Sequence, residues 1–306
     1  MSLIKVLRER TGAGISDCKK AIESSNGDVE QAIKVLREKG LASAAKKTSN
    51  VASEGLVACE ISSDGKTGFV CEVNCQTDFV AKGDDFKAIA QSCLEVFVAN
   101  SDSADLLNVK TKDGAVLSDF IKASIVKTGE NVNLRRQAKL SVDKGVVASY
   151  VHNAVSANFG KIVVLLGIQS VANQDKLKEL GKKICMHIAS MNPVSIDETG
   201  VAPELIENEK EIFIKQAQES GKPQNVIDKM VDGRIKKYLS ESVLLQQSFV
   251  MDSKLSVQDF IKAFEKENSC TVTLTKFVCF KLGEGVEKKE ENFADEVAQF
   301  VKNAAK

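Results

Sequence analysis

The chain has 306 residues, a length typical of about two domains. Its 42 basic and 42 acidic residues cancel, so it lacks the basic excess typical of a generic nucleic-acid-binding protein, and we expect no direct nucleic-acid partner. The longest apolar stretch, 162–168, is far shorter than the roughly 20 residues of a membrane span. It predicts one buried strand, and we expect no membrane association.

The amino-terminal residues lack the apolar core of a secretory signal, and acidic residues occur early. We therefore expect a cytoplasmic protein whose eight cysteines are reduced thiols. The chain has two histidines and no Cys-x2-Cys pair, and Cys71 and Cys75 are the only close cysteines. No phosphate-loop motif is present, and Gly12 and Gly14 do not follow a predicted strand. We expect no bound metal or cofactor.

Residues 1–47 predict three short helices of the ubiquitin-associated type. Ser16 is the expected cap of the second helix, and Asp28, with Gln31 three residues later, the expected cap of the third. Gly40 is expected to end the third helix, and 48–53 is a polar linker. The basic pair Lys19 and Lys20 is interpreted either as a solvated face or as part of a docking surface.

An internal repeat relates residues 54–93 to residues 144–185. Gly55 matches Gly145, Gly68 matches Gly160, and Cys93 matches Cys185. Each copy is predicted to form a strand, a turn, a strand and a helix. We therefore predict an α+β core made of two duplicated subdomains, at 54–143 and 144–282.

The two copies differ at the corner between the second strand and the helix. The first has Thr77, Asp78, Phe79 and Val80, where the second has Gln-Ser-Val-Ala at 169–172. A phenylalanine after an acidic residue at such a corner has two interpretations. It packs back on the core as a helix cap, or it stays exposed as a contact residue.

The carboxyl-terminal half predicts a helical hairpin inserted at about 194–240. Pro203 and Pro223 are expected to open its two helices, Pro223 at the first helical position, with Gly221 between them. Leu205, Ile206, Ile212 and Phe213 are expected to face inward from its first helix. The apolar seam is interpreted as a self-association surface or as packing between the two helices. A strand is predicted at 271–282 and an amphipathic helix at 292–305, inside a terminal module at 283–306.

Several long motifs together resemble the translation elongation factor Ts family. They are LRERTGAGISDCKKAI, EVNCQTDFVAK, MHIASMNPVSID, GKPQNVIDKMVDGRIKKY, QQSFVMD and FKLGEGVEKKEENFADEV. The resemblance runs from residue 3 to about residue 301. It implies a guanine-nucleotide exchange factor for the GTPase elongation factor Tu, with no active site of its own. It also implies an amino-terminal ubiquitin-associated-like domain, a two-subdomain core, an inserted hairpin and a terminal module.

The resemblance also assigns contact residues. Thr77, Asp78, Phe79 and Val80 would form a wedge that displaces Mg²⁺ and GDP from the partner and so permits reloading with GTP. His152, Gly129, Lys19 and Lys20 would make further contacts with that GTPase. The loop after His152 departs from the glycine-rich turn common in the family, and Lys82 stands where arginine is common.

Two other classes stay open. A ubiquitin-associated adaptor would need an apolar Met-Gly-Phe or Met-Gly-Tyr loop, which Thr11-Gly-Ala-Gly does not provide. A cysteine- or zinc-dependent enzyme would depend on Cys71 and Cys75, and their replacement by serine would abolish its activity.

Overall fold

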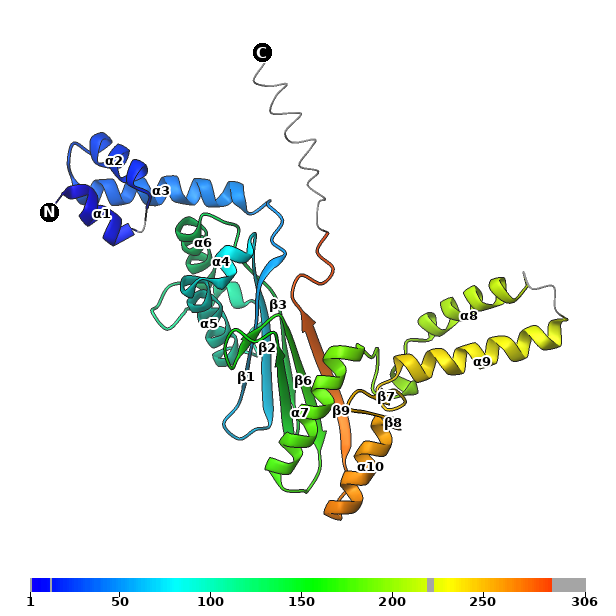
Figure 1. Cartoon of the computed structure of the whole chain (residues 1–306). Coiled ribbons are helices and arrows are strands. Elements are labelled where there is room, and N and C mark those ends of the chain that lie inside the picture. Colours follow the sequence, from blue (N-terminus) through cyan, green and yellow to red (C-terminus); the bar gives the residue numbers. More distant parts are fainter. Residues whose placement is uncertain (1, 12, 219–222, 288–306) are drawn as a thin grey trace. The chain divides into compact units, whose positions relative to one another are not determined.

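The computed structural model describes residues 2–11, 13–218 and 223–287. The chain divides into two units: unit 1 comprises Met1–Leu56, Glu72–Arg136 and Leu282–Lys306, and unit 2 comprises Val57–Cys71 and Gln137–Lys281. Figure 1 shows the helices and strands of both units. Helices and antiparallel strands both contribute, which confirms a mixed fold class consistent with the predicted α+β fold.

The first three helices of unit 1 share a small apolar core. They are α1 (Leu3–Thr11), α2 (Ile15–Ser24) and α3 (Val29–Lys47). Their buried core side chains are Leu7, Cys18, Ala21, Ala32 and Leu36. Asp28 caps α3 as predicted, because its carboxylate accepts a hydrogen bond from the backbone N–H of Gln31 at 3.0 Å.

Two predicted helix ends in this region are wrong. Helix α2 begins at Ile15 with Gly14 as its N-cap, so Ser16 lies inside the first turn and is not the cap. Helix α3 also continues through Gly40. A Cβ at Gly40 would lie 3.0 Å from both γ-carbons of Val126, so the missing side chain lets α3 approach α6 (Leu117–Thr128) closely. This packing offsets the roughly 1 kcal/mol that a helical glycine costs.

The strands of the described residues form three sheets. Their orders are β3-β2-β1-β5, β4-β6-β9 and β7-β8. The strands are β1 (Glu54–Ile61), β2 (Thr67–Cys75), β3 (Asn133–Ser141), β4 (Val146–His152), β5 (Phe159–Gly160), β6 (Ile162–Gln169), β7 (Ser248–Phe249), β8 (Asp252–Ser256) and β9 (Thr273–Lys281). Strand β6 covers the predicted apolar strand, pairs antiparallel with β4 and β9, and has buried interior residues, several of which pack in the core with α7.

The main core of unit 2 lies between the three-stranded sheet and helices α7 (Gln174–Met191) and α10 (Val257–Asn268). Helix α7 packs against β4 and β6 (Figure 1). Leu177, Ile184 and Ile188 of α7 are fully buried there with Leu166 and Ile168 of β6. The spacing of these α7 residues places them on one helical face, which accounts for the close packing.

The strand–turn–strand–helix order occurs twice. In the first copy, β1 and β2 precede α4 (Asp78–Lys82) and α5 (Asp84–Ala99), and η1 (Leu106–Asn108) and α6 follow. In the second, β4 and β6 precede α7, with the short β5 between them. Gly55 and Gly145 adopt φ of +134° and +103°, and a Cβ at either would lie 2.1 Å from a backbone oxygen, that of Val73 or of Ile168. The two glycines therefore have the same backbone role, which supports the predicted duplication.

Unit 2 also contains η2 (Glu198–Gly200) and the predicted pair of helices, α8 (Pro203–Gln218) and α9 (Gln224–Ser242). The apolar contact between α8 and α9 is centred on Ala217, Ile227 and Val231. The guanidinium of Arg234 also lies 5.5 Å from the ring centroid of Phe213.

Three predictions for this pair are wrong in detail. Pro223 is the N-cap of α9 and precedes its first helical position. Leu205 and Ile212, expected to face inward, are 43% and 46% exposed. The helix contact uses the neighbouring stripe that contains Phe213 and Ala217, which lie one helical turn apart. Gly221 and the predicted helix at 292–305 lie outside the described residues.

Candidate protein-docking site

The corner between β2 and α4 presents Phe79 to solvent. Strand β2 ends at Cys75, α4 begins at Asp78, and Phe79 is 83% exposed. Ala81, two residues later, is buried. Successive helical residues are rotated by about 100°, so these two side chains point to nearly opposite sides of α4. The burial of Ala81 thus turns Phe79 outward, and the interpretation that Phe79 packs back on the core is wrong.

Thr77 caps the short helix. Its backbone is extended, and its hydroxyl oxygen accepts a hydrogen bond from the backbone N–H of Val80 at 3.4 Å. Helix α4 has five residues and ends at Lys82, and its C-cap Gly83 is also the N-cap of α5. Helices this short depend on their caps and tertiary contacts, because they contain few internal hydrogen bonds.

Asp78 forms an ion pair with Lys82 one turn along α4. The Lys82 Nζ lies 2.6 Å from Asp78 Oδ2, and the two side chains are 69% and 43% exposed. The hydrogen bond to Asp78 raises the pKa of the Lys82 ammonium. An exposed pair of this kind can be exchanged for other partners, so a docking protein could reach the Asp78 carboxylate by displacing Lys82.

Glu130 supports the corner from the segment after α6. Its carboxylate accepts hydrogen bonds from the backbone N–H groups of Gln76 at 3.1 Å and Thr77 at 3.0 Å. It also accepts one from the Thr77 hydroxyl at 2.5 Å. Glu130 was not among the site residues predicted from the sequence. Its position next to Gly129, in a segment that the family resemblance assigns to partner contacts, could have drawn attention to it.

Gly129 ends α6 in a left-handed conformation, with φ of +78°. Its N–H donates to the Ile125 carbonyl at 2.9 Å, and its own carbonyl accepts a hydrogen bond from Lys47 Nζ. The structure therefore brings Gly129 into the same unit as the Phe79 corner, joined to it through Glu130. The glycine has a structural role as a helix C-cap in addition to any contact role.

His152 ends β4 in unit 2 and is exposed. Its Nδ1 lies 3.0 Å from the Tyr150 hydroxyl, and both side chains line a hollow of about 330 Å³ with Met186, Val250 and Met251 among its other lining residues. The following loop closes by a hydrogen bond from the Val155 N–H to the Phe159 carbonyl at 2.8 Å.

Lys19 and Lys20 lie on α2, and both are exposed. The ammonium of Lys19 lies 4.0 Å from a carboxylate oxygen of Glu23, one turn along the helix. An exposed helical pair of this kind has little effect on stability, so both lysines remain accessible to a partner.

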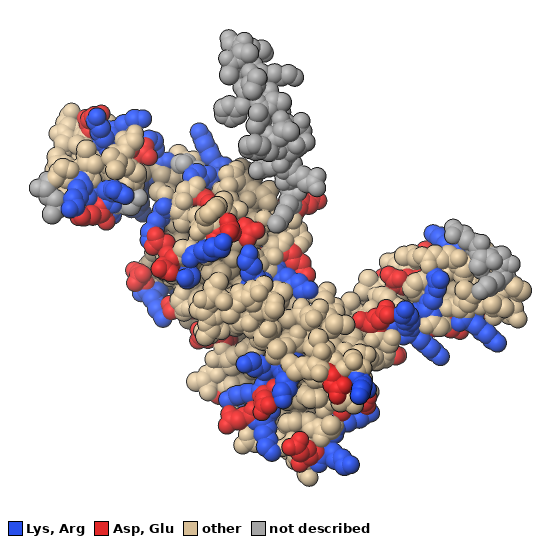
Figure 2. Space-filling model, viewed as in Figure 1, with Lys and Arg blue, Asp and Glu red and all other residues tan. Residues whose placement is uncertain are grey.

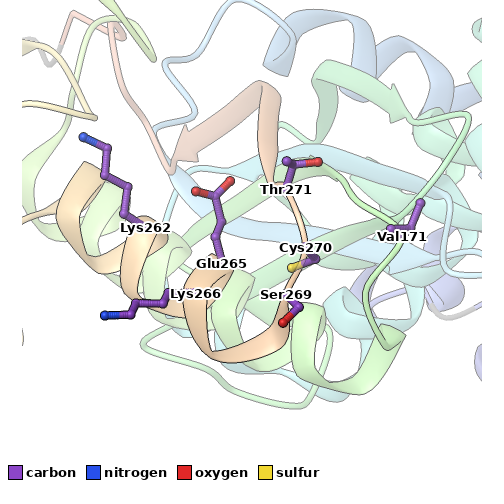
Figure 3. Close-up of a pocket in the computed structure, with 7 residues that line it drawn as sticks. All are labelled: Val171, Lys262, Glu265, Lys266, Ser269, Cys270 and Thr271. Atoms are coloured by element: carbon purple, nitrogen blue, oxygen red, sulfur yellow. The ribbon is translucent and has the colours of Figure 1, made fainter.

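The corresponding corner of the second repeat copy carries Val171, which is 84% exposed. It borders a hollow lined by residues from the end of α10 and the following turn, Lys262, Glu265, Lys266, Ser269, Cys270 and Thr271 (Figure 3). Figure 3 shows Lys262 and Lys266 pointing away from Val171. The Glu265 carboxylate has a hydrogen-bond partner within the chain, because it accepts the Val272 N–H at 2.7 Å.

Several buried cysteines are poor nucleophiles in this fold. Cys71 and Cys75 are fully buried in β2. Burial raises the pKa values of the Cys59, Cys75 and Cys93 thiols to about 12. Thiolates are therefore rare at neutral pH, which disfavours a cysteine-dependent enzyme. Within the described ranges, no group of three or more His, Cys, Asp and Glu residues is arranged to hold a metal ion.

Acidic and basic side chains are interspersed over the face shown in Figure 2, in keeping with the zero net charge. Across 2–11, 13–218 and 223–287, none of the helices has the length and apolarity that a membrane crossing requires. An exposed aromatic ring on a capped turn held by Glu130 is a candidate contact for a partner protein, because aromatic side chains supply much of the contact energy in interfaces.

Comparison with known proteins identifies the family. A family model described as Elongation factor TS matches residues 76–284. A protein named elongation factor Ts from Rickettsia bellii is 45% identical over 300 residues, which cover 98% of this chain and 96% of the relative. One from Clostridium acetobutylicum is 48% identical over 299 residues, with coverages of 97% and 96%. The chain belongs to the elongation factor Ts family, a family of translation elongation factors.

Proposed function

We propose that this chain is the guanine-nucleotide exchange factor for elongation factor Tu. It binds the GDP-bound GTPase, displaces Mg²⁺ and GDP, and leaves the nucleotide site open for GTP. The proposal is supported by the family membership over nearly the whole chain and by one structural observation, the exposed Phe79 on a capped turn.

The physical basis of exchange is thermodynamic linkage. A protein that binds the nucleotide-free GTPase more tightly than the GDP-bound form must weaken GDP binding by the same factor. GDP is held through its phosphates and Mg²⁺, so a wedge that disturbs this region of the partner is sufficient. Such a factor contributes shape and contact energy to the partner and requires no acid, base or nucleophile of its own.

The wedge consists of Thr77, Asp78, Phe79 and Val80. Phe79 supplies the apolar area that inserts beside the partner's nucleotide domain. Asp78 exchanges its ion pair with Lys82 for hydrogen-bonding groups of the partner, and disturbs the Mg²⁺ region without holding the ion itself. Thr77 and Val80 keep the turn in shape through the cap hydrogen bond at 3.4 Å. His152, Gly129, Lys19 and Lys20 make further contacts with the same GTPase.

The direct test is the release of fluorescent GDP from the cognate elongation factor Tu, with wild-type protein and with Phe79→Ala. Truncation of an aromatic anchor weakens binding by about 2–4 kcal/mol. Each 1.4 kcal/mol corresponds to about tenfold, so GDP release at subsaturating factor should fall by more than tenfold. Val171→Ala is the matched control, because Val171 is equally exposed at the corresponding corner of the second copy and should leave exchange unchanged.

The fold should survive the Phe79 substitution. The side chain is 83% exposed, so its loss should change the free energy of unfolding by less than about 0.5 kcal/mol. Acceleration by the wild type that is lost in folded Phe79→Ala supports the proposal. No acceleration by the wild type with an authentic partner contradicts the exchange function and favours an adaptor. Acceleration that survives in Phe79→Ala contradicts the wedge alone.

We also propose a domain organisation and a cytoplasmic location suited to this role. The domains are a ubiquitin-associated-like domain at 1–47, core subdomains at 54–143 and 144–282, a hairpin inserted at about 194–240 and a terminal module at 283–306. The three helices with their own apolar cluster support the first of these. The repeated strand–turn–strand–helix order supports the two core subdomains.

The α8–α9 pair is proposed to mediate self-association. Its inner stripe is used for packing between the helices, but Leu205, Ile212 and Val226 remain 43%, 46% and 37% exposed. Exposed apolar side chains on neighbouring helices are typical of contact surfaces. Sedimentation velocity should show an assembly for the wild type that is weakened in Ile212→Glu. An unchanged sedimentation profile of the folded variant would exclude this surface.

A further inference from the structure

The strongest unassigned feature is the carboxylate of Glu130. One oxygen, Oε2, accepts hydrogen bonds from two consecutive backbone N–H groups, those of Gln76 and Thr77, at 3.1 and 3.0 Å. The other, Oε1, accepts the Thr77 hydroxyl at 2.5 Å. Glu130 lies 53 residues from Thr77 in the sequence and half-buried beside it. Three donors converging on one carboxylate hold the chain firmly just before α4, because charge-assisted hydrogen bonds are stronger than neutral ones.

The Thr77 hydroxyl passes this constraint to the helix. It has one proton, which it donates to Glu130, so a lone pair is left to accept the Val80 N–H at 3.4 Å. Glu130 therefore fixes the orientation of the cap, and the cap fixes the first turn of α4. Phe79 lies within this turn, with Ala81 buried on the other side.

The residues flanking Glu130 are also held. Its own N–H donates to the Thr128 hydroxyl at 3.3 Å, and the next N–H, of Asn131, donates to the Gln76 side-chain carbonyl at 2.8 Å. The Asn131 amide group donates to the Asn50 carbonyl at 2.7 Å. The Glu130 backbone is thus fixed from both sides, and its carboxylate is directed at the corner without a separate ordering step.

We infer that Glu130 is the positioning residue of the docking site, which holds the Thr77 cap so that Phe79 is presented in its binding orientation before the partner arrives. The inference rests on the proposed exchange function and adds a residue outside the wedge to it. A turn that is already ordered loses less conformational entropy on binding, so the clamp increases the share of contact energy available for nucleotide displacement.

Glu130→Gln is the informative substitution. It keeps the side-chain length but removes the charge: the one remaining oxygen accepts the two backbone N–H groups as a neutral acceptor, and the amide N–H₂ replaces the oxygen that accepts the Thr77 hydroxyl proton. Hydrogen exchange at the Gln76 and Thr77 amides should accelerate by about tenfold or more, the effect of losing one hydrogen bond to a charged acceptor. GDP release from elongation factor Tu should slow by a similar factor at subsaturating concentration. Glu95→Gln is the matched control, because Glu95 pairs with Lys112 at 3.0 Å away from the corner.

A double-mutant cycle separates positioning from general stability. If Glu130 acts through Phe79, Glu130→Gln should slow exchange strongly in the wild-type background and by less than about twofold in the Phe79→Ala background. Equal effects in both backgrounds, or wild-type exchange by folded Glu130→Gln, would overturn the inference while leaving the exchange function intact. Failure of the wild type to accelerate GDP release would overturn both.

If Glu130→Gln does not fold, two variants of Thr77 test the inference instead. Thr77→Ser keeps the hydroxyl that joins Glu130 to the cap, whereas Thr77→Val removes it at nearly constant volume. We expect exchange to be about tenfold slower with the valine variant than with the serine variant. Equal rates for the two would contradict the inference, because the hydroxyl is the link through which Glu130 orients α4.

Discussion

Glu72 on β2 is a fully buried carboxylate in unit 1, and Glu72→Gln should destabilise that unit strongly. Arg135 Nη1 lies 3.0 and 3.2 Å from its two oxygens, and Arg136 Nε lies 2.6 Å from Oε2. Oε1 also accepts the Asn74 side-chain amide at 3.0 Å and the Gly283 N–H at 2.8 Å. The side chain is 0% exposed, so every polar contact of the carboxylate comes from the protein.

The size of the effect follows from what the substitution leaves behind. Removing one partner of a buried ion pair costs about 3–5 kcal/mol, chiefly because the opposite charge stays buried and unpaired. Glutamine keeps the volume and one acceptor oxygen, and the arginine side chains are 26% and 29% exposed, so water can partly compensate them. We therefore expect about 3 kcal/mol, at the lower end of this range.

Native-state hydrogen exchange at 72–75 and 133–136 is the suitable assay. The chain has no tryptophan, and its two tyrosines, Tyr150 and Tyr238, both belong to unit 2, so intrinsic fluorescence does not report on unit 1. Glu284→Gln is the control, because Glu284 pairs with Arg136 at 3.2 Å but is 47% exposed. It should cost less than about 1 kcal/mol. Equal opening free energies for wild type and Glu72→Gln would refute the reasoning.

The same network predicts a pH dependence. Burial by itself raises the pKa of Glu72, but hydrogen bonds from the Gly283 N–H, Asn74 and Arg136 outweigh it, so the carboxyl pKa lies below its usual value. A carboxyl whose pKa is lower in the folded state stabilises the protein above the unfolded pKa, about 4.3. This stabilisation is lost as the pH falls through the folded pKa. The difference between wild type and Glu72→Gln should therefore shrink below about pH 4.

Two further predictions concern unit 2. Burial lowers the pKa of His187, whose Nε2 lies 2.9 Å from the Gln247 side-chain oxygen. Below about pH 6.5 the unfolded state therefore binds more protons than the folded state, so the free energy of unfolding should fall as the pH decreases. His187→Gln should remove this dependence. Urea titrations followed by circular dichroism measure it. Gly145→Ala should lower the free energy of unfolding by about 2–3 kcal/mol in the same titration, because its Cβ would lie 2.1 Å from a backbone oxygen of β6. Gly233→Ala is the control. A Cβ at Gly233 has no neighbour within 4 Å, so this variant should not be destabilised.

The sequence was sufficient for features that depend on local pattern. The three amino-terminal helices, the α8–α9 pair, the apolar strand β6 and the repeated strand–turn–strand–helix order follow from periodicity and turn residues within short windows. The end of α3 was wrong because Gly40 is a helix breaker by local propensity, yet its missing side chain serves a contact with Val126. Leu205 and Ile212 were misplaced because α8 carries apolar residues on more than one face, and only the contact with α9 selects between them.

Part of the candidate site was also predicted from a local sequence pattern. The acid–aromatic pair at a strand-to-helix corner is visible in the sequence, and its exposure follows once Ala81 is buried beneath it. Glu130 could not be found in this way, because its three hydrogen bonds reach across more than 50 residues. Long-range pairing of a carboxylate with backbone donors leaves no periodic signal in the chain.

The two corners of the repeat are equally exposed but differ in their side chains and in the contacts that hold them. Phe79 and Val171 are 83% and 84% exposed, so exposure alone does not distinguish them. The second corner is held by Ser170, whose hydroxyl accepts the Ala172 N–H at 3.2 Å, a local hydrogen bond between neighbours. The first is held by a charged group from a distant segment and presents an aromatic ring, which offers more apolar area than valine to a partner. A support from a distant segment together with a large side chain favours the first corner over the second for the proposed docking role, because contact energy is then not spent on ordering the turn.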